Sequence, residues 1–252
     1  MPYSSRGQDL LSRFVHTNTE GQLFAALEKT TAEIGFSYFA MGHHVDLLRP
    51  PNDAVRLCNY QASWIEHSLA ERYYVNDPIH YASTKTAAGF LWSSIPEWVS
   101  LSIKQLSVLH RSREYGLSEG FTVPVHIPGE YRGTCSFAAA NLDRVRRHSL
   151  PVANLAGIYA FEAARRIMRA RAGSRHWALD VPVLTGRQHD ALVLMARGKG
   201  DPEIASLLGI AASTAHEHVE NVRRLYGNAQ RVFLVVRALF DGQISWWEVF
   251  GR

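Results

Sequence analysis

Residues 181–252 contain closely spaced start and stop signals for short helices, and this pattern restricts that stretch to an all-helical fold. Thr185-Gly-Arg-Gln188 matches a capping box, in which a hydroxyl and an amide side chain pair with free N–H groups at a helix start. Asp201-Pro-Glu predicts a second start, with Asp201 as the N-cap. Glycines at 198, 209 and 242 are typical helix stops. We expect four helices here.

The second and third of these helices are separated only by the short turn Gly209-Ile-Ala211, which predicts a helix-turn-helix. Ala215, Val219, Val222 and Tyr226 recur at helical spacing and are expected to face the core. The opposite face is then free to enter a major groove about 12 Å wide. Its residues are Ser213, Thr214, His216, Glu217, Glu220 and Arg224. An ordinary hairpin in a helical bundle is the alternative that this pattern alone leaves open.

The chain before residue 172 mixes helical and strand patterns, so the fold class is α+β. Residues 21–35 predict a helix with Leu23, Leu27 and Ile34 on one face, and residues 36–45 and 54–60 predict strands. Residues 59–74 again have helical spacing. Two apolar runs around residues 128–131 predict a hairpin, in which Pro124 indicates a strand edge or a bulge. A long helix is expected over residues 151–172.

Composition excludes several classes of protein. With 46% hydrophobic and 20% charged residues, the chain can bury a sizeable core and is neither disordered nor fibrous. No apolar run approaches the roughly 20 residues of a membrane helix, and the N-terminal residues lack the apolar segment of a secretory signal. The two cysteines are too few for a disulfide scaffold, and the histidines lack metal-ligand spacing. We therefore expect a cytoplasmic protein without metal or cofactor.

The net charge of +4 is unevenly distributed. Residues 142–175 carry a net charge of +6, whereas residues 176–252 sum to zero. The basic excess is expected as a solvated helix face followed by a linker over residues 173–180. The alternative is that the arginines of this helix and linker contact phosphates or another subunit. The arginines concerned are Arg165, Arg166, Arg169, Arg171 and Arg175.

Residues 184–231 resemble the C-terminal domain of the LuxR-type quorum-sensing regulators. The match includes Leu184, Thr185, Arg187, Leu192, Ala196, Gly198, Lys199, Glu203, Ile204, Ala205, Leu208, Ile210, Thr214, His218 and Asn221. The family's glutamate in the first helix is Gln188 here, a serine at the turn is Ala211, and a late lysine of the recognition helix is Leu225. The resemblance implies binding to promoter DNA, and reading two half-sites implies a homodimer.

The region over residues 20–170 resembles the same family's domain for N-acyl-homoserine lactones. The family pattern is matched by Tyr60, Trp64, Asp77, Pro78 and Trp92, and further on by residues 116–120, Pro124 and Ser136. The resemblance implies an α-β-α sandwich that binds ligand and dimerises over residues 1–172, followed by the linker and a helix-turn-helix domain over 181–252. A mostly apolar pocket with a few aimed polar groups suits such a ligand.

The resemblance also assigns roles to these residues. Trp64 donates its indole N–H to the lactone carbonyl, and Asp77 accepts the amide N–H of the ligand. Tyr60 and Ser136 contact the acyl carbonyl, and Trp92 packs against the head group. The wall around the acyl tail is not defined by these motifs. Ala40, Gly42, Tyr73, Tyr74 and Phe90 are candidates for it or for ordinary packing.

Ser68 stands where the family has a second tyrosine. The smaller side chain leaves space, which predicts a bulky acyl group that is long, branched or aromatic. The alternative is that Tyr73 or Tyr74 fills the gap.

The sequence bears differently on two further functions. A lactone-hydrolysing enzyme is disfavoured, because the chain has no G-x-S-x-G, H-E-x-x-H or phosphate-loop motif. An orphan regulator that answers a non-lactone signal, or no signal, fits the same fold. The residues after Gly242, which include Trp246, Trp247 and Phe250, are unusually apolar and are expected to pack on the fourth helix or at an interface.

Overall fold

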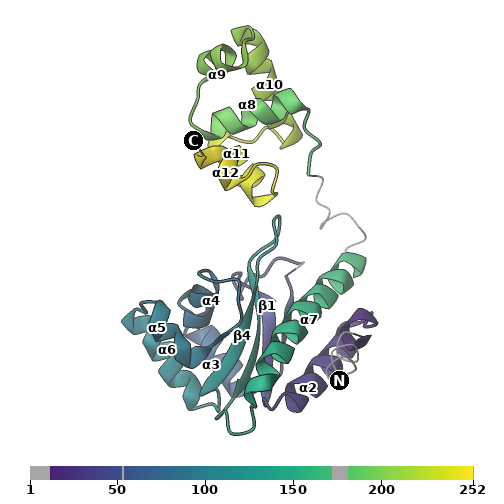
Figure 1. The fold of residues 1–252 in the computed structure, drawn as a ribbon, viewed down its shortest axis with the longest axis vertical. Helices are drawn as coiled ribbons and strands as arrows, with labels where there is room; N and C mark the ends of the chain where they lie inside the picture. The colour runs from purple at the N-terminus through teal and green to yellow at the C-terminus, as the bar shows by residue number, and fades with distance from the viewer. Residues whose placement is uncertain (1–11, 53, 172–180, 252) are drawn as a thin grey trace. The chain divides into compact units, whose positions relative to one another are not determined.

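The computed structural model describes residues 12–52, 54–171 and 181–251, which belong to two compact units (Figure 1). The larger unit contains most of the described residues up to Arg171, and the smaller unit is built on residues 181–251. Each unit has its own hydrophobic core. The predicted linker over residues 173–180 lies outside the described residues.

The larger unit is built on an antiparallel sheet, with strand order β2-β1-β5-β4-β3 in the described part of the chain. The strands are β1 (Tyr38–His43), β2 (Arg56–Cys58), β3 (Phe90–Leu91), β4 (Glu119–Val125) and β5 (Gly133–Ala139). β4 and β5 form the predicted hairpin. β4 is not an edge strand of the described sheet, and Pro124 pairs with Thr134 of β5. Because β3 pairs with β4 only at Phe121 and Thr122, Pro124 has no partner in β3, and the sheet tolerates a proline there.

Alternate residues of the central strands face opposite sides of the sheet, as the pleat demands. Phe39 of β1 and Phe137 of β5 point into the core on one face and are fully buried. Ala40 and Ser136, which pair across the same two strands, line a cavity on the other face. One face of the sheet thus forms the hydrophobic core, and the other forms a wall of the cavity.

Helices cover both faces of the sheet (Figure 1). α2 (Glu20–Glu33) and α7 (Leu150–Arg171) close the core that contains Leu23, Leu27 and Phe161. The shorter helices on the cavity face are α3 (Ala62–Ala70), α4 (Pro78–Ser83), α5 (Ile95–Trp98) and α6 (Ile103–Arg113). Single 3-10 turns lie at η1 (Tyr73–Val75), η2 (Trp92–Ser94) and η3 (Arg147–Ser149). The α+β class is confirmed.

One predicted helix is shorter than its periodicity indicates. The helical spacing over residues 59–74 is only partly used, because α3 ends at Ala70. Arg72 adopts a left-handed conformation, with a φ of 52°, which an α-helix cannot continue through. Tyr73 is therefore carried by a separate 3-10 turn, and that turn brings it beside Trp64.

The basic excess around α7 is only partly a solvated face: Arg169 and Arg171 are exposed, but Arg165 and Arg166 are not. Arg165 is only 7% exposed and pairs with Glu162. Arg166 donates hydrogen bonds to the carbonyls of Phe14 and Thr17, and Arg171 forms an ion pair with Glu20 at 2.7 Å. Arg166 and Arg171 thus connect α7 to the start of α2 and the residues before it, whereas Arg165 pairs within α7. Arg175 lies outside the described residues.

From residue 181 on, the described part of the smaller unit contains helices and no strand. The helices are α8 (Gly186–Ala196), α9 (Asp201–Leu208), α10 (Ala212–Leu225), α11 (Arg231–Phe240) and α12 (Trp246–Phe250). The predicted capping box of Thr185 and Gln188 is confirmed, with both hydrogen bonds present. α9 ends at Gly209, whose φ of 65° requires a residue tolerant of the left-handed region. Ala215, Val219 and Val222 face the core as expected.

Two predictions for this unit were wrong. The N-cap of α9 is Gly200 rather than Asp201. Asp201 is the first residue of the helix, and its carboxylate does not cap it. The apolar tail also forms a short fifth helix, α12, that lies against α8. Ile244 is buried in the core of the unit, while Trp246, Trp247 and Phe250 remain exposed.

No helix within the described ranges combines the length and apolar composition needed to cross a bilayer.

Candidate ligand-binding site

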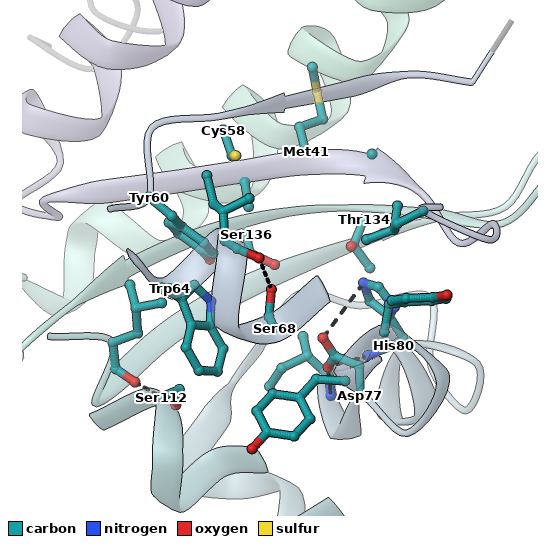
Figure 2. A pocket seen from close by; sticks show the side chains of 18 of the residues that line it. Met41, Cys58, Tyr60, Trp64, Ser68, Asp77, His80, Ser112, Thr134 and Ser136 are labelled. Atoms are coloured by element: carbon teal, nitrogen blue, oxygen red, sulfur yellow. Dashed lines mark hydrogen bonds and ion pairs between the residues drawn. The ribbon is translucent and has the colours of Figure 1, made fainter. Parts of the chain in front are cut away.

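A cavity of about 180 Å³ lies between the sheet and the short helices of the larger unit. All of the ligand-contacting residues predicted from the sequence line it, although they come from distant parts of the chain (Figure 2). They are Tyr60, Trp64, Ser68, Asp77, Trp92 and Ser136. The fold therefore brings the whole predicted set to one place.

A chain of hydrogen bonds crosses the cavity wall from Trp92 to Ser136. The indole Nε1–H of Trp92 donates to Thr122 Oγ1 at 2.8 Å, and Thr122 Oγ1 lies 2.8 Å from Ser136 Oγ. An indole N–H can only donate. Thr122 is fully buried, so its own proton is best placed toward Ser136. Ser136 then keeps its proton for a carbonyl group in the cavity.

Trp92 can approach the sheet because Gly120 has no side chain. A Cβ at this position of β4 would lie 2.5 Å from Trp92 Cε2, well inside contact distance. The glycine in the 116–120 motif thus has a packing reason, and it sets the position of one cavity wall.

Asp77 combines a structural role with an exposed carboxylate oxygen. It is the N-cap of α4, and its Oδ1 accepts hydrogen bonds from the backbone N–H groups of Ile79 and His80, at 2.7 and 3.2 Å. Oδ2 makes no such cap contact and lies 3.9 Å from His80 Nε2. One oxygen of this carboxylate therefore fixes the helix, and the other is left to accept a hydrogen bond.

Tyr60 and Trp64 form the aromatic end of the cavity. Burial, reinforced by the nearby Cys58 and Asp77, raises the pKa of Tyr60, so it remains a phenol with a proton to donate. The Trp64 ring packs against Tyr73 and Tyr115, with ring centroids 5.9 and 5.2 Å away. These contacts hold the Trp64 ring in place.

Ser68 donates its hydroxyl to the carbonyl of Ile65 within its own helix, at 3.0 Å. Tyr73 and Tyr74 also line the cavity, as do Ala40 and Gly42. Phe90 does not line it: its ring packs against Trp98 of α5, within the buried cluster that also contains Trp64 and Trp92.

Leu117, in the 116–120 motif, lines the cavity, but sequence reasoning missed other lining residues, including Met41, Ile79, His80, Val108 and Thr134. Thr134 carried a signal, because it lies two residues from Ser136 in a strand and so on the same face.

His80, which lines the cavity beyond Asp77, stacks on His44. The rings of His44 and His80 lie 3.8 Å apart at an interplanar angle of 20°. Burial, and then the charges of His80, His126, His43 and Arg132, lower the pKa of His44 to about 2. The ring is therefore neutral at physiological pH, and one of its nitrogens is an acceptor.

The smaller unit presents the predicted outer face of α10. Ser213, His216, Glu217 and Arg224 are exposed, while Thr214 and Glu220 are half-buried. Glu220 pairs with Arg223 at 2.6 Å, which offsets part of its negative charge.

Asp201, at the start of α9, pairs with His216 at 2.7 Å and with Arg231 of α11. Burial alone would raise the pKa of Asp201, but the hydrogen bonds from His216 and Arg231 outweigh it and leave that pKa lowered.

The fold and the cavity define a two-unit protein with a small-molecule site in an α+β unit. The model of the autoinducer binding domain family matches residues 19–164, more than half of the chain. The chain belongs to this family, and it is a LuxR-type quorum-sensing regulator, as its motifs predict.

Curated relatives align over nearly the whole chain. The transcriptional activator protein AhyR of Aeromonas hydrophila is 27% identical over 93% of this chain and 90% of its own length. The quorum-sensing regulator RhlR of Pseudomonas aeruginosa is 25% identical over 88% and 89%. Among solved structures, SdiA of Escherichia coli has a TM-score of 0.65 at 19% identity, covering 96% of this chain and 99% of that one. SdiA with bound octanoyl-rac-glycerol gives the same score.

Proposed function

We propose that this chain binds an N-acyl-homoserine lactone in the cavity of its larger unit and thereby controls binding of its smaller unit to promoter DNA. The ligand-binding and dimerisation domain would comprise residues 1–172, and the helix-turn-helix domain residues 181–252. The observation that carries the proposal is the gathering of the family-motif residues around one cavity with complementary polarity. Such a regulator acts in the cytoplasm, where promoter DNA lies.

Each polar group of the ligand has a suitable partner. The amide N–H needs an acceptor, and Asp77 Oδ2 is left over from helix capping. The acyl carbonyl needs donors, which Ser136 and Tyr60 provide through their hydroxyls. The lactone carbonyl is assigned to the indole N–H of Trp64. Each contact pairs a polar group that would otherwise be buried without a hydrogen-bond partner, and leaving such a group unpaired costs about 1–3 kcal/mol.

Calorimetric titration with a panel of acyl-homoserine lactones tests the proposal. Asp77→Asn is the informative variant, because its Oδ1 still caps α4 while Nδ2 meets the ligand N–H with a second donor. We expect at least a tenfold loss of lactone affinity, with little change in thermal stability. If no lactone binds the unaltered protein, the proposed ligand class is wrong.

A non-lactone ligand is the second candidate, and two observations favour it. Ser68 replaces the family tyrosine, and SdiA, of similar fold, has been solved with octanoyl-rac-glycerol. A monoacylglycerol has no amide N–H, so Asp77→Asn should leave its affinity nearly unchanged. The same variant therefore separates the two ligand classes. Mass spectrometry of the purified protein identifies whichever molecule it carries.

The acyl group is proposed to be bulky, because Ser68 replaces a phenol. A lactone panel in which a short straight chain binds most tightly would contradict this. The remaining alternative, lactone hydrolysis, predicts ring-opened product after incubation with the protein. We expect the intact lactone to be recovered, because the relatives are named transcriptional activators.

For the smaller unit, we propose that α10 enters the major groove and that the chain binds as a homodimer. The support is the exposed polar face of α10 behind a buried apolar one. Mobility shifts with a two-half-site operator should show two chains per duplex. A single chain binding with full affinity would overturn the dimer.

A further inference from the structure

The cavity has a second polar region beyond the groups assigned to the lactone. Thr134 and Ser136 are on the same face of β5 and both line the cavity. Being two residues apart in a strand, they are separated by about 7 Å. Their partners on β1 are Gly42 and Ala40, whose small side chains leave the space between them open. Figure 2 shows Thr134 and His80 across the cavity from Tyr60 and Trp64.

This far region is polar although it is buried. Thr134 is 4% exposed, and its Oγ1 lies 3.3 Å from His44 Nε2. The His44 ring stacks on His80, whose ring lines the cavity. The Nε2 of His80 is 3.9 Å from Asp77 Oδ2, beyond hydrogen-bonding distance. Hydrogen-bonding groups are therefore present where an acyl tail would need only hydrocarbon.

The chemistry of these groups selects among ligand ends. A methyl group would meet the hydroxyl and the imidazole without pairing with either. A carboxylate would bring a charge into a cavity lined mainly by apolar side chains, at a desolvation cost. A hydroxyl both donates and accepts, so it pairs with Thr134 and His80 whichever nitrogen of His44 carries the proton. The neutral state of His44 agrees with this preference.

We propose that the acyl group of the ligand carries a hydroxyl about 7 Å beyond its carbonyl, bound between Thr134 and His80. The proposal rests on the function proposed above and names the chemical class of its ligand. The His80 ring, held by stacking on His44, gives this part of the cavity an aromatic wall, which suits a phenolic ring as well as a hydroxylated alkyl chain.

Matched pairs of lactones test the proposal by titration calorimetry. One pair is hexanoyl-homoserine lactone and its ω-hydroxy analogue, and the other is the phenylpropanoyl lactone and its para-hydroxy analogue. We expect the hydroxylated member of at least one pair to bind about tenfold more tightly than its parent, and the pair that shows this identifies the chain type. Equal or weaker binding of both hydroxylated members would overturn the proposal.

Variants locate the effect. Thr134→Val keeps the shape of the side chain and should reduce the preference for the hydroxylated member to within about twofold, with the parent lactone still bound. His80→Phe keeps a flat ring and should act in the same direction. Thr134→Ser restores the hydroxyl and should restore the preference. Ser107→Ala, which removes an exposed hydroxyl of α6 outside the cavity, is the matched control.

The outcomes separate this proposal from the proposed function. If no lactone of either pair binds, the proposed function fails. If the parents bind and hydroxylation brings no gain, only the present inference fails. If the preference persists in Thr134→Val and His80→Phe, the hydroxyl binds elsewhere and the assignment to these residues is wrong. Binding of the parent lactone reports that each variant is folded.

Discussion

At the scale of single residues, the cavity depends on groups that do not themselves carry the family motif. Thr122 has no place in that motif, yet its hydroxyl connects the indole N–H of Trp92 to the hydroxyl of Ser136. Asp77, by contrast, belongs to the family motif and also stabilises the fold as the N-cap of α4. Ligand recognition and local stability therefore have to be separated by the choice of substitution.

Thr122→Val should weaken ligand binding although Thr122 is absent from the cavity lining. The indole N–H of Trp92 loses its acceptor, and Ser136 loses the partner that orients its hydroxyl. We expect about a tenfold rise in the dissociation constant and a loss of about 1–3 kcal/mol in the free energy of unfolding. Thr122→Ser should recover both. A valine variant that binds as tightly as the unaltered protein would show that Ser136 needs no such orientation.

The buried His44 makes the stability of the larger unit depend on pH. Its folded-state pKa is about 2, against an unfolded value near 6.5, because burial and then His80, His126, His43 and Arg132 oppose its charge. The unfolded chain thus binds a proton that the folded chain excludes, so stability falls as pH drops below about 6.5. Thermal unfolding between pH 7.5 and 5 should show this decline.

His44→Gln should flatten that decline, because glutamine does not titrate. His148→Gln, at an exposed position, is the control and should leave the decline unchanged. An equally steep pH dependence in the His44 variant would assign the effect to another group.

At the scale of elements, the sequence predicted those whose cause is local. The helix over Leu23 and Leu27, the capping box at Thr185 and the turn at Gly209 follow from side chains within a few residues of one another. The end of α3 did not follow, because Arg72 adopts its left-handed conformation without any glycine or proline to signal it. The surroundings of Phe90 were equally hidden, since its partner Trp98 depends on how β3 and α5 pack.

The candidate site divides in the same way. Motif spacing identified the polar residues that line the cavity, because such residues recur at fixed intervals in the family. Thr122 and His44 were missed, because their importance arises only from contacts with residues far away in the chain. The partners of Arg166 were missed for the same reason, since Phe14 and Thr17 accept its hydrogen bonds across the larger unit.

Asp201 joins three helices of the smaller unit through its contacts with His216 and Arg231. Asp201→Asn should therefore lower the free energy of unfolding by about 1 kcal/mol at pH 7, or about 4–8 °C in a domain of this size. The pKa of Asp201 is lowered in the folded state. Asp201 therefore stabilises the fold fully above its unfolded-state pKa, and this stabilisation is lost as the pH falls through its folded-state pKa. Circular dichroism melts at pH 7 and pH 3 measure this difference.

Glu217→Gln, which removes an exposed acid from α10, is the control for that substitution and should leave the melting temperature within about a degree. A similar loss in both variants would mean that net charge, rather than the Asp201 contacts, determines the stability of the unit.

At the scale of the whole molecule, the charge distribution limits how the chain can bind DNA. The basic excess of residues 142–175 is partly used inside the larger unit, where Arg165, Arg166 and Arg171 have partners. Residues 176–252 have no net charge. Electrostatic attraction to DNA must therefore come from a few local cations, of which Arg224 is exposed on the outer face of α10.

The salt dependence of DNA binding measures how many such cations contact phosphates. Each one contributes about 0.9 to the slope of log affinity against log salt concentration. Arg224→Gln should therefore reduce the slope by about 1 for each chain bound. Arg171→Gln removes an equal charge, but one that is paired with Glu20, and should leave the slope unchanged. If the Arg171 variant flattens the slope and the Arg224 variant does not, α7 contacts the phosphates and the outer face of α10 has another role.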